Sequence, residues 1–410
     1  MSSGRPAARA RQGRRWLGRF GLAAALAAVA GSAGCSAGQR PAPGPAVTST
    51  VEHWGSLFGG RRGNFDTLTS PTRLTVPGTV AEVGTSNSTQ YALLTDGRLY
   101  AWGLGTAGQL GDGRRANSFT RPVRVRFPRG VKIAWIPTDV MPYDTALAVD
   151  TTGHAWGWGD NGGGELCRSG TRSYLRPVRL PLRQVTAVAG ASNHAIYDAA
   201  GTVYACGQNV AGDLGDGSTR STTTPARVAG LPRSPVVRLV AAFANSGALL
   251  ADGKYFDWGY NRQGQLGDGR AGRPSDVPVR VHLPHPVRQV AQGGSLWGNG
   301  QTLVLLSNGR LRAWGDDRAY QLGNGRTGRQ PSPVRIRAQA GVTYQSLATG
   351  SATSYAVTAS GQVYAWGVSH VGQVGDGRTG TARLSVLVAA GATLISATAN
   401  NVVISVPGQP

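Results

Sequence analysis

The sequence predicts an all-β fold: a seven-bladed β-propeller with four antiparallel strands per blade, closed by a blade built from both chain ends. Three observations lead to this prediction: a recurring phrase, four strand-like segments in each copy, and half-copies at the two ends. The phrase is an aromatic residue and a glycine followed by a glycine-rich turn, as in Trp102-Gly103 and then Gly108–Gly113. Its copies are anchored at positions 54, 102, 158, 206, 258, 314 and 366, a period of about 50 residues.

Each copy contains four short segments with strand character. In the copy around Trp102, Val80–Val83 alternates, Tyr91–Leu94 is apolar, Leu99–Trp102 alternates again, and Arg121–Val125 is a short segment interrupted by proline. Asp96-Gly97 lies between the second and third segments, and Asp-Gly at such a place is a hairpin signal because glycine accepts a positive φ. Four strands per copy therefore suit one propeller blade.

The two ends of the chain each supply half a copy. The repeat region begins at Val51–Trp54, in the middle of a copy, and ends with the segments Leu394–Ser396 and Val402–Ser405. We expect the last two segments to complete the blade begun by Val51–Leu74, because mixing both ends in one blade removes exposed sheet edges.

The hairpin, the phrase Val363-Tyr364-Ala365-Trp366-Gly367 and the turn Gly108-Gln109-Leu110-Gly111-Asp112-Gly113 resemble the regulator of chromosome condensation repeat. The resemblance covers about Thr50–Pro410 and implies a seven-bladed propeller. The first copy (60–64) and the third (162–167) depart from the pattern. The family name also implies nucleotide exchange on a chromatin-bound GTPase, which we do not carry over because the chain has an export signal.

The first 49 residues predict export and anchoring. Residues 1–34 have the arginine-rich start, the short apolar run and the small-residue end of a lipoprotein-type signal peptide, with Cys35 as the lipid attachment site. Residues 35–49 are a Pro, Ala, Gly and Ser tether, and 50–410 are the propeller. The chain is therefore expected at the outer face of the cell membrane. A plain signal peptide, giving a secreted protein, is the alternative.

The charge balance favours an anionic partner. The formal net charge is +22, and removal of six leader arginines leaves 36 basic against 20 acidic residues, or +16. We expect neither nucleic acid nor a small GTPase as partner, because an exported protein would not meet them. We also expect no cofactor and no metal, since no known ligand or nucleotide motif occurs.

Two cysteines besides Cys35 stand at repeat positions. Cys167 takes the place of Gly111 and Cys206 that of Trp102, in successive copies. They are a possible disulfide in an oxidising compartment, and two buried free thiols are the alternative. The repeated Trp is expected in the core, and Asp112 with its counterparts is expected to form turns.

One arginine lies at the matching place of the fourth segment in every copy, two residues after a proline in six copies and after Thr381 in the seventh. The set comprises Arg73, Arg124, Arg179, Arg227, Arg280, Arg335 and Arg383. It forms either a basic ring for an anionic partner or a set of structural residues packed between blades.

Function is expected in the loops that differ between copies. The candidate partner-binding residues are Arg114, Arg115, Phe119, Tyr260, Arg262, Arg318, Tyr320, Arg326 and His370. The leading hypothesis is a monomeric, non-catalytic cell-surface scaffold that binds a protein. A binder of an anionic cell-wall polymer is one alternative, and a hydrolase or lyase with its site in the central funnel is another. No catalytic residue is assigned.

Overall fold

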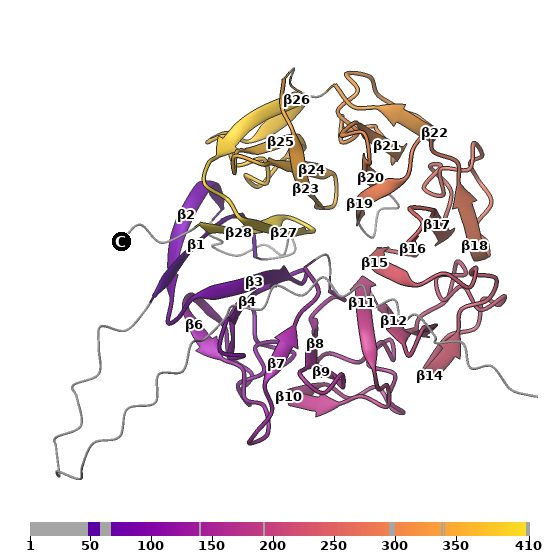
Figure 1. The fold of residues 1–410 in the computed structure, drawn as a ribbon. Coiled ribbons are helices and arrows are strands. Elements are labelled where there is room, and N and C mark those ends of the chain that lie inside the picture. The colour runs from indigo at the N-terminus through magenta and orange to yellow at the C-terminus, as the bar shows by residue number, and fades with distance from the viewer. Residues whose placement is uncertain are drawn as a thin grey trace, which may run out of the picture. The chain divides into compact units, whose positions relative to one another are not determined.

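The computed structural model describes residues 48–57, 67–138, 141–191, 193–294, 300–337, 339 and 341–406. In these residues the chain forms 28 strands and no helix, arranged as seven sheets of four antiparallel strands (Figure 1). The expected leader, Cys35 and all but the last two residues of the expected tether lie outside the described residues.

We number the sheets as blades 1 to 7. Blade 1 contains β1 (Ser49–Gly55), β2 (Leu68–Val76), β27 (Leu394–Thr398) and β28 (Asn401–Val406). Blade 2 contains β3 (Val80–Thr85), β4 (Thr89–Leu94), β5 (Leu99–Gly103) and β6 (Ser118–Arg124). Blade 3 contains β7 (Ile133–Trp135), β8 (Thr145–Asp150), β9 (Ala155–Gly159) and β10 (Tyr174–Arg179). Blade 4 contains β11 (Val185–Ala191), β12 (His194–Ala199), β13 (Thr202–Gly207) and β14 (Thr222–Arg227).

The remaining blades follow the same order. Blade 5 contains β15 (Val236–Ala242), β16 (Asn245–Leu250), β17 (Tyr255–Gly259) and β18 (Ser275–Val281). Blade 6 contains β19 (Val287–Gly294), β20 (Gly300–Leu306), β21 (Leu311–Asp316) and β22 (Arg329–Arg335). Blade 7 contains β23 (Tyr344–Thr349), β24 (Thr353–Thr358), β25 (Val363–Ser369) and β26 (Gly380–Ala389).

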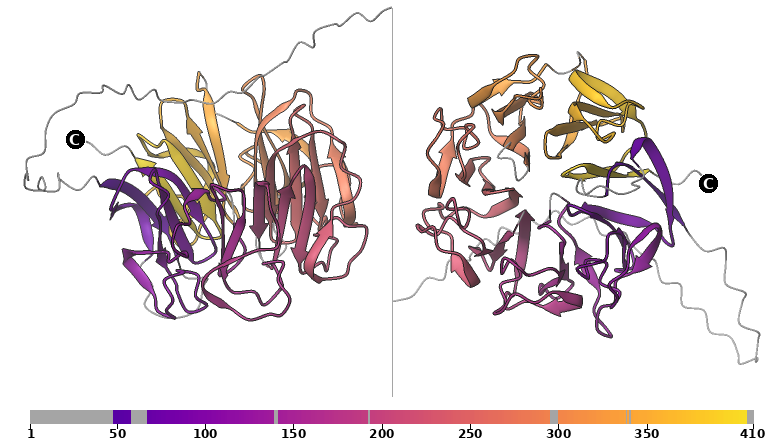
Figure 2. Two further views of the ribbon diagram at one scale, coloured as in Figure 1. Left: turned by 60° about the horizontal axis from the view of Figure 1, so that its bottom comes forward. Right: turned by 180° about the vertical axis from the view of Figure 1, so that it is seen from behind.

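The blades surround a central axis, with β3, β7, β11, β15, β19, β23 and β27 innermost (Figures 1 and 2). Blade 1 has the strand order β2-β1-β28-β27, which confirms that both chain ends build the closing blade. We call the end of the ring that carries the loops between third and fourth strands the motif face. The opposite end, with the hairpins between second and third strands and the links to the next blade, is the hairpin face.

In five blades the repeated tryptophan joins its blade to the one before it. The side chains of Trp54, Trp102, Trp158, Trp258, Trp314 and Trp366 are fully buried, as expected of core residues. The Trp158 indole N–H donates to the Gln109 carbonyl at 2.8 Å. The same bond recurs from Trp54, Trp258, Trp314 and Trp366 at 2.8 to 3.0 Å. This tether holds every such motif loop in a fixed place.

Blade 4 lacks the tryptophan tether and has a covalent one. A disulfide joins Cys206 to Cys167 of blade 3, with Cα atoms 5.3 Å apart. Tyr197 in blade 4 donates its hydroxyl to the Glu165 carbonyl at 3.0 Å, which is the bond that the tryptophan makes elsewhere. Cys167, Tyr197 and Cys206 thus take the place of the tryptophan–glycine contact at this boundary.

The motif aspartates form turns, as the sequence predicts. The carboxylates of Asp112, Asp216, Asp268 and Asp376 each accept the backbone N–H two residues later, at 3.0 to 3.1 Å. Such short-range bonds fix the loop backbone. The motif loops are therefore presented on a stiff frame.

Candidate functional site

Six of the seven predicted ring arginines share one register on the fourth strand. Arg124 lies opposite Tyr100, Arg280 opposite Phe256 and Arg335 opposite Arg312. Arg73, Arg179 and Arg227 lie opposite Glu52, Trp156 and Tyr204. All six are exposed at the outer edge of the ring.

The seventh assignment, Arg383, is wrong in register. Leu387 lies opposite Tyr364 and takes the ring position in blade 7. The seventh copy lacks the proline that marks this strand, so the sequence offered no marker there. Arg383 lies four residues earlier, and its guanidinium stacks over the ring of Tyr320 in blade 6, 5.2 Å from the ring centroid.

The ring arginines differ in their partners. Arg73 forms an ion pair with Glu52 at 3.2 Å, on its own blade. Arg179 contacts His154 Nε2, whose other ring nitrogen lies 3.7 Å from Asp150. The Arg124 and Arg335 side chains make no hydrogen bond or ion pair with any described residue. A single role for all the ring positions therefore does not fit the structure.

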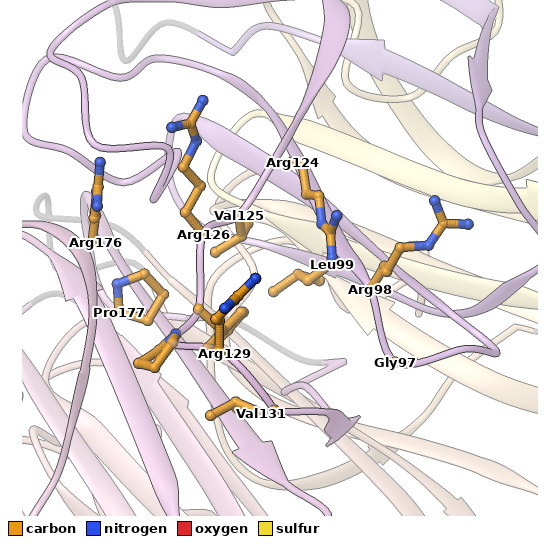
Figure 3. Close-up of a pocket in the computed structure, with 13 residues that line it drawn as sticks. Gly97, Arg98, Leu99, Arg124, Val125, Arg126, Arg129, Val131, Arg176 and Pro177 are labelled. Carbon is orange, nitrogen blue, oxygen red and sulfur yellow. The ribbon is translucent and has the colours of Figure 1, made fainter.

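Groove A is a hollow of about 810 Å³ at the boundary of blades 2 and 3. Five arginines line it: Arg98, Arg124, Arg126, Arg129 and Arg176. Figure 3 shows these side chains standing around the opening, from the β4–β5 hairpin, the end of β6, the β6–β7 link and β10. No acidic residue is among its described lining residues.

Groove B is a similar hollow of about 750 Å³ at the boundary of blades 6 and 7. Arg310, Arg326, Arg335 and Arg337 line it, again with no acidic residue among the described ones. Two backbone bonds show the equivalence of the grooves: Arg126 N–H donates to the Gly111 carbonyl and Arg337 N–H to the Gly323 carbonyl. The same three arginine positions therefore recur in both grooves.

Most groove arginines were not among the candidates from sequence. Only Arg124, Arg326 and Arg335 were named, and Arg326 was named as a loop residue. The sequence signal that could have revealed them is that two other arginine positions recur near the ring arginine in blades 2 and 6. Arg98 and Arg310 immediately precede the third strand, and Arg126 and Arg337 lie two residues after the ring arginine.

The predicted loop residues of blades 5 to 7 come together in pairs across blade boundaries on the motif face. Asp316 binds the exposed Arg318 guanidinium through both carboxylate oxygens, at 2.8 and 3.0 Å. It raises the pKa of Arg318, and the Tyr260 hydroxyl of blade 5 adds to this effect. With the Tyr320–Arg383 stack, aromatic and arginine side chains cross two successive boundaries.

The other loop candidates lie apart from these pairs. Arg114, Arg115 and Phe119 belong to blade 2, where Arg115 donates to the Thr106 carbonyl at 2.9 Å. Arg262 and His370 are exposed on the motif loops of blades 5 and 7. The nine predicted residues therefore do not form one surface.

At the hairpin face the inner strands line a hollow of about 480 Å³, which includes Glu82, Trp135 and Val237. Glu82 is the one carboxylate among the described residues that line this hollow. Glu82 accepts the Ile136 N–H at 2.7 Å. The described residues hold no cluster of three metal-binding side chains, and none of their segments is a helix long and apolar enough to span a membrane.

Known proteins share this sequence pattern. The family described as "Regulator of chromosome condensation (RCC1) repeat" matches residues 96–137, 200–246 and 252–302. The Ultraviolet-B receptor UVR8 of Arabidopsis thaliana is 28% identical over 291 residues, 68% of this chain and 63% of the receptor. Human E3 ubiquitin-protein ligase HERC2 is 29% identical over 354 residues, 84% of this chain and 7% of the ligase. The chain thus spans less than two thirds of either relative.

Solved structures share the fold. Human WBSCR16 superposes with a TM-score of 0.76 at 20% identity, covering 88% of this chain and 100% of that one. Yeast RCC1 (Prp20), in its structure with Kap60, gives 0.72 at 20% identity, covering 89% and 90%. Three stretches of this chain thus match the RCC1 repeat, and its ring of seven four-stranded blades has the fold of these solved structures.

Proposed function

We propose that this chain is a non-catalytic interaction scaffold that holds a protein partner on the motif face of blades 5 to 7. The observation that carries the proposal is the stack of Arg383 on Tyr320 across the boundary of blades 6 and 7. Arg318, bound by Asp316, and Tyr260 extend this row of aromatic and arginine side chains on the motif face. Tyrosine and arginine are enriched at the energetic centres of protein interfaces.

The row is held ready for binding. The Trp314 and Trp366 tethers fix the motif loops of blades 5 and 6 at 2.8 and 2.9 Å. Asp316 holds Arg318 on two oxygens. Because little side-chain and loop motion remains to be lost, more of the contact energy appears as affinity.

The related structures support a protein as the partner, and the expected leader suggests where in the cell it is found. Structures of yeast Prp20 are titled for its complex with Kap60 and for its binding to Gsp1p and histones, so propellers of this fold do bind proteins. An export signal with lipidated Cys35 would place the present chain, and hence its partner, at the outer face of the cell membrane.

Site-specific photo-cross-linking in cells tests the proposal. A photoreactive residue replaces Tyr320, and the matched control carries it at Arg227, an exposed position at the outer edge of blade 4. We expect a protein adduct from position 320 but not from 227. The additional change Arg383→Ala should lower its yield about tenfold, as expected for loss of an interface anchor.

Two outcomes would contradict the proposal. One is no protein adduct from position 320 in cells that carry the full-length chain. The other is the same adducts from positions 320 and 227, which would show contact without a defined surface. Thermal melting of each variant checks that the propeller is intact.

A further inference from the structure

Grooves A and B hold an excess of positive charge. One carboxylate, Asp96, lies beside groove A: it pairs with Arg98 Nε at 2.6 Å and also interacts electrostatically with Arg124. The side chains of Arg124, Arg126, Arg129 and Arg176 make no ion pair or hydrogen bond with described residues, and all four are exposed. Like charges gathered without counter-charges repel one another, so a ligand that neutralises them gains binding energy.

The ring position alone does not set the grooves apart. Arg73 pairs with Glu52 and Arg179 contacts His154, whereas Arg227 and Arg280 make no ion pair or side-chain hydrogen bond with any described residue. The grooves differ in having a second arginine two residues after the ring position, Arg126 in groove A and Arg337 in groove B, where blades 4 and 5 have Ala229 and His282. The additional arginines therefore add positive charge at the two hollows, grooves A and B.

The directions of the arginines favour phosphate. In groove A they come from a hairpin, a strand end, an inter-blade link and the next blade (Figure 3). A planar carboxylate presents two oxygens in one plane, whereas a tetrahedral phosphate accepts guanidinium donors from several sides. Several phosphates in a row would meet donors along the whole groove.

Groove A offers no stacking platform for bases. Phe127 is the aromatic residue among its lining residues, and its ring already packs edge-on against Trp156 and Trp158, with centroids 5.9 and 5.5 Å away. Proteins that bind single-stranded nucleic acid combine basic grooves with free aromatic faces. The groove therefore suits a phosphate chain without bases.

We propose that grooves A and B are two equivalent binding sites for consecutive phosphate groups of a linear, base-free phosphate polymer. This inference does not depend on the protein partner proposed for the motif face, because none of the residues Tyr260, Arg318, Tyr320 and Arg383 lines either groove.

Calorimetric titration with tripolyphosphate tests the proposal on the full chain at about 50 mM salt, where charge interactions are weakly screened. We expect two sites per chain. The variant R126S/R129S/R176S should keep one site, with affinity at the altered groove reduced about 100-fold or more, as expected for loss of three charge-assisted hydrogen bonds. The change Tyr320→Ala should leave both sites intact.

The matched control removes the same charge elsewhere. The variant R183S/R227S/R233S changes three exposed arginines outside both grooves and should retain two sites. If the groove variant fails to fold, Arg129→Glu in the exposed link replaces it and should weaken one site. Equal loss in the groove and control variants would overturn the assignment, because it would show a general charge effect.

Two further arms distinguish ligand chemistry. Oligo-dT and poly-glutamate are titrated beside a polyphosphate of matched charge. Tighter binding of oligo-dT would assign the grooves to nucleic acid, and tighter binding of poly-glutamate would assign them to carboxylates. Either result would refute the phosphate assignment, whereas preference for polyphosphate supports it.

Discussion

The boundary between blades 3 and 4 should depend on the redox state, unlike the boundaries that have a tryptophan tether. Reduction, or Cys206→Ser, removes the covalent link between the two blades. The disulfide spans 39 residues, for which the loop-entropy relation gives about 4 kcal/mol of stability. We expect the free energy of unfolding to fall by about that amount in reductant.

The tryptophan tether can be rebuilt only by changing three residues together. At other boundaries a Cβ on the motif glycine would lie 2.6–2.8 Å from the tryptophan Nε1, so Cys167 leaves no room for a tryptophan. Tyr197 stands where the other blades carry a smaller residue: Ala92, Ala148, Ala248, Val304, Ala356 and Ile404. Cys206→Trp alone should therefore overpack the boundary by about 1–3 kcal/mol and also lose the disulfide.

The variant C167G/Y197A/C206W should restore the common boundary. A buried Trp contributes about 4–6 kcal/mol by area, its N–H bond to the Glu165 carbonyl about 1 more, and glycine at φ +52 relieves strain. These gains offset the lost disulfide and Tyr197 packing to within about 2 kcal/mol of the oxidised parent.

Equilibrium guanidinium unfolding with and without dithiothreitol measures these differences. We expect the parent to lose stability on reduction and the triple variant to show no change. Cys206→Trp alone should be the least stable protein of the series. The reasoning is refuted if the triple variant is no more stable than Cys206→Trp alone, or if reductant leaves the parent unchanged.

Two further predictions concern buried ionisable groups that stand where four other blades have alanine and blade 3 has Gly157. Burial raises the pKa of Asp257 well above its usual range, so the unfolded chain releases this proton first and stability falls as pH rises above about 4. Asp257→Asn should remove this pH-dependent loss of stability, which amounts to up to about 1.4 kcal/mol per pH unit. Unfolding measured at pH 4 and pH 8 should therefore show that the variant's free energy of unfolding gains on the parent's as pH rises. An equal difference at both pH values would contradict the burial argument. Burial lowers the pKa of His53 from 6.5 to about 4, so stability falls as pH drops from about 6.5 to 4, by about 3 kcal/mol at most. His53→Ala should make the free energy of unfolding less dependent on pH between about 6.5 and 4. An unchanged pH dependence, measured by unfolding at several pH values, would refute the assignment.

The fold was predictable because each blade repeats the same local physics. Asp96-Gly97 supplies the positive φ of a hairpin, and Trp102 marks the end of the third strand. The strands on either side of these markers can then be located from their alternation of apolar and polar residues. Closure also followed from the sequence, since the strand pairs at the two ends had no other partners than one another.

The register of the outer strand was harder, because the proline that marks it is missing in blade 7. In the other six copies the ring arginine lies two residues after a proline, whereas its distance from the glycine of the repeated phrase varies, from Gly55–Arg73 to the longer Gly103–Arg124. Loop length therefore could not replace the missing proline, and only strand pairing shows that Leu387 lies opposite Tyr364.

The grooves could not be located from sequence because they depend on how links pass between blades. The β6–β7 link (125–132) and the β22–β23 link (336–343) each have eight residues, and they carry arginines over a boundary. The β14–β15 link (228–235) has the same length, yet Ala229 stands where the other two links have Arg126 and Arg337. Link length therefore makes space, whereas charge depends on the individual residues.

Departures from the repeat have different energetic meanings. Cys167, Tyr197 and Cys206 change together and compensate one another, so they leave a complete boundary. Asp257 Oδ1 is buried without a hydrogen-bond partner, and this cost is not compensated within the described residues. The groove arginines other than Arg98 also lack ion-pair partners among the described residues, but unlike Asp257 they are exposed, and they recur in two blades. Because repulsion among exposed arginines is relieved by an anion from solution, their recurrence favours a binding role over a structural one.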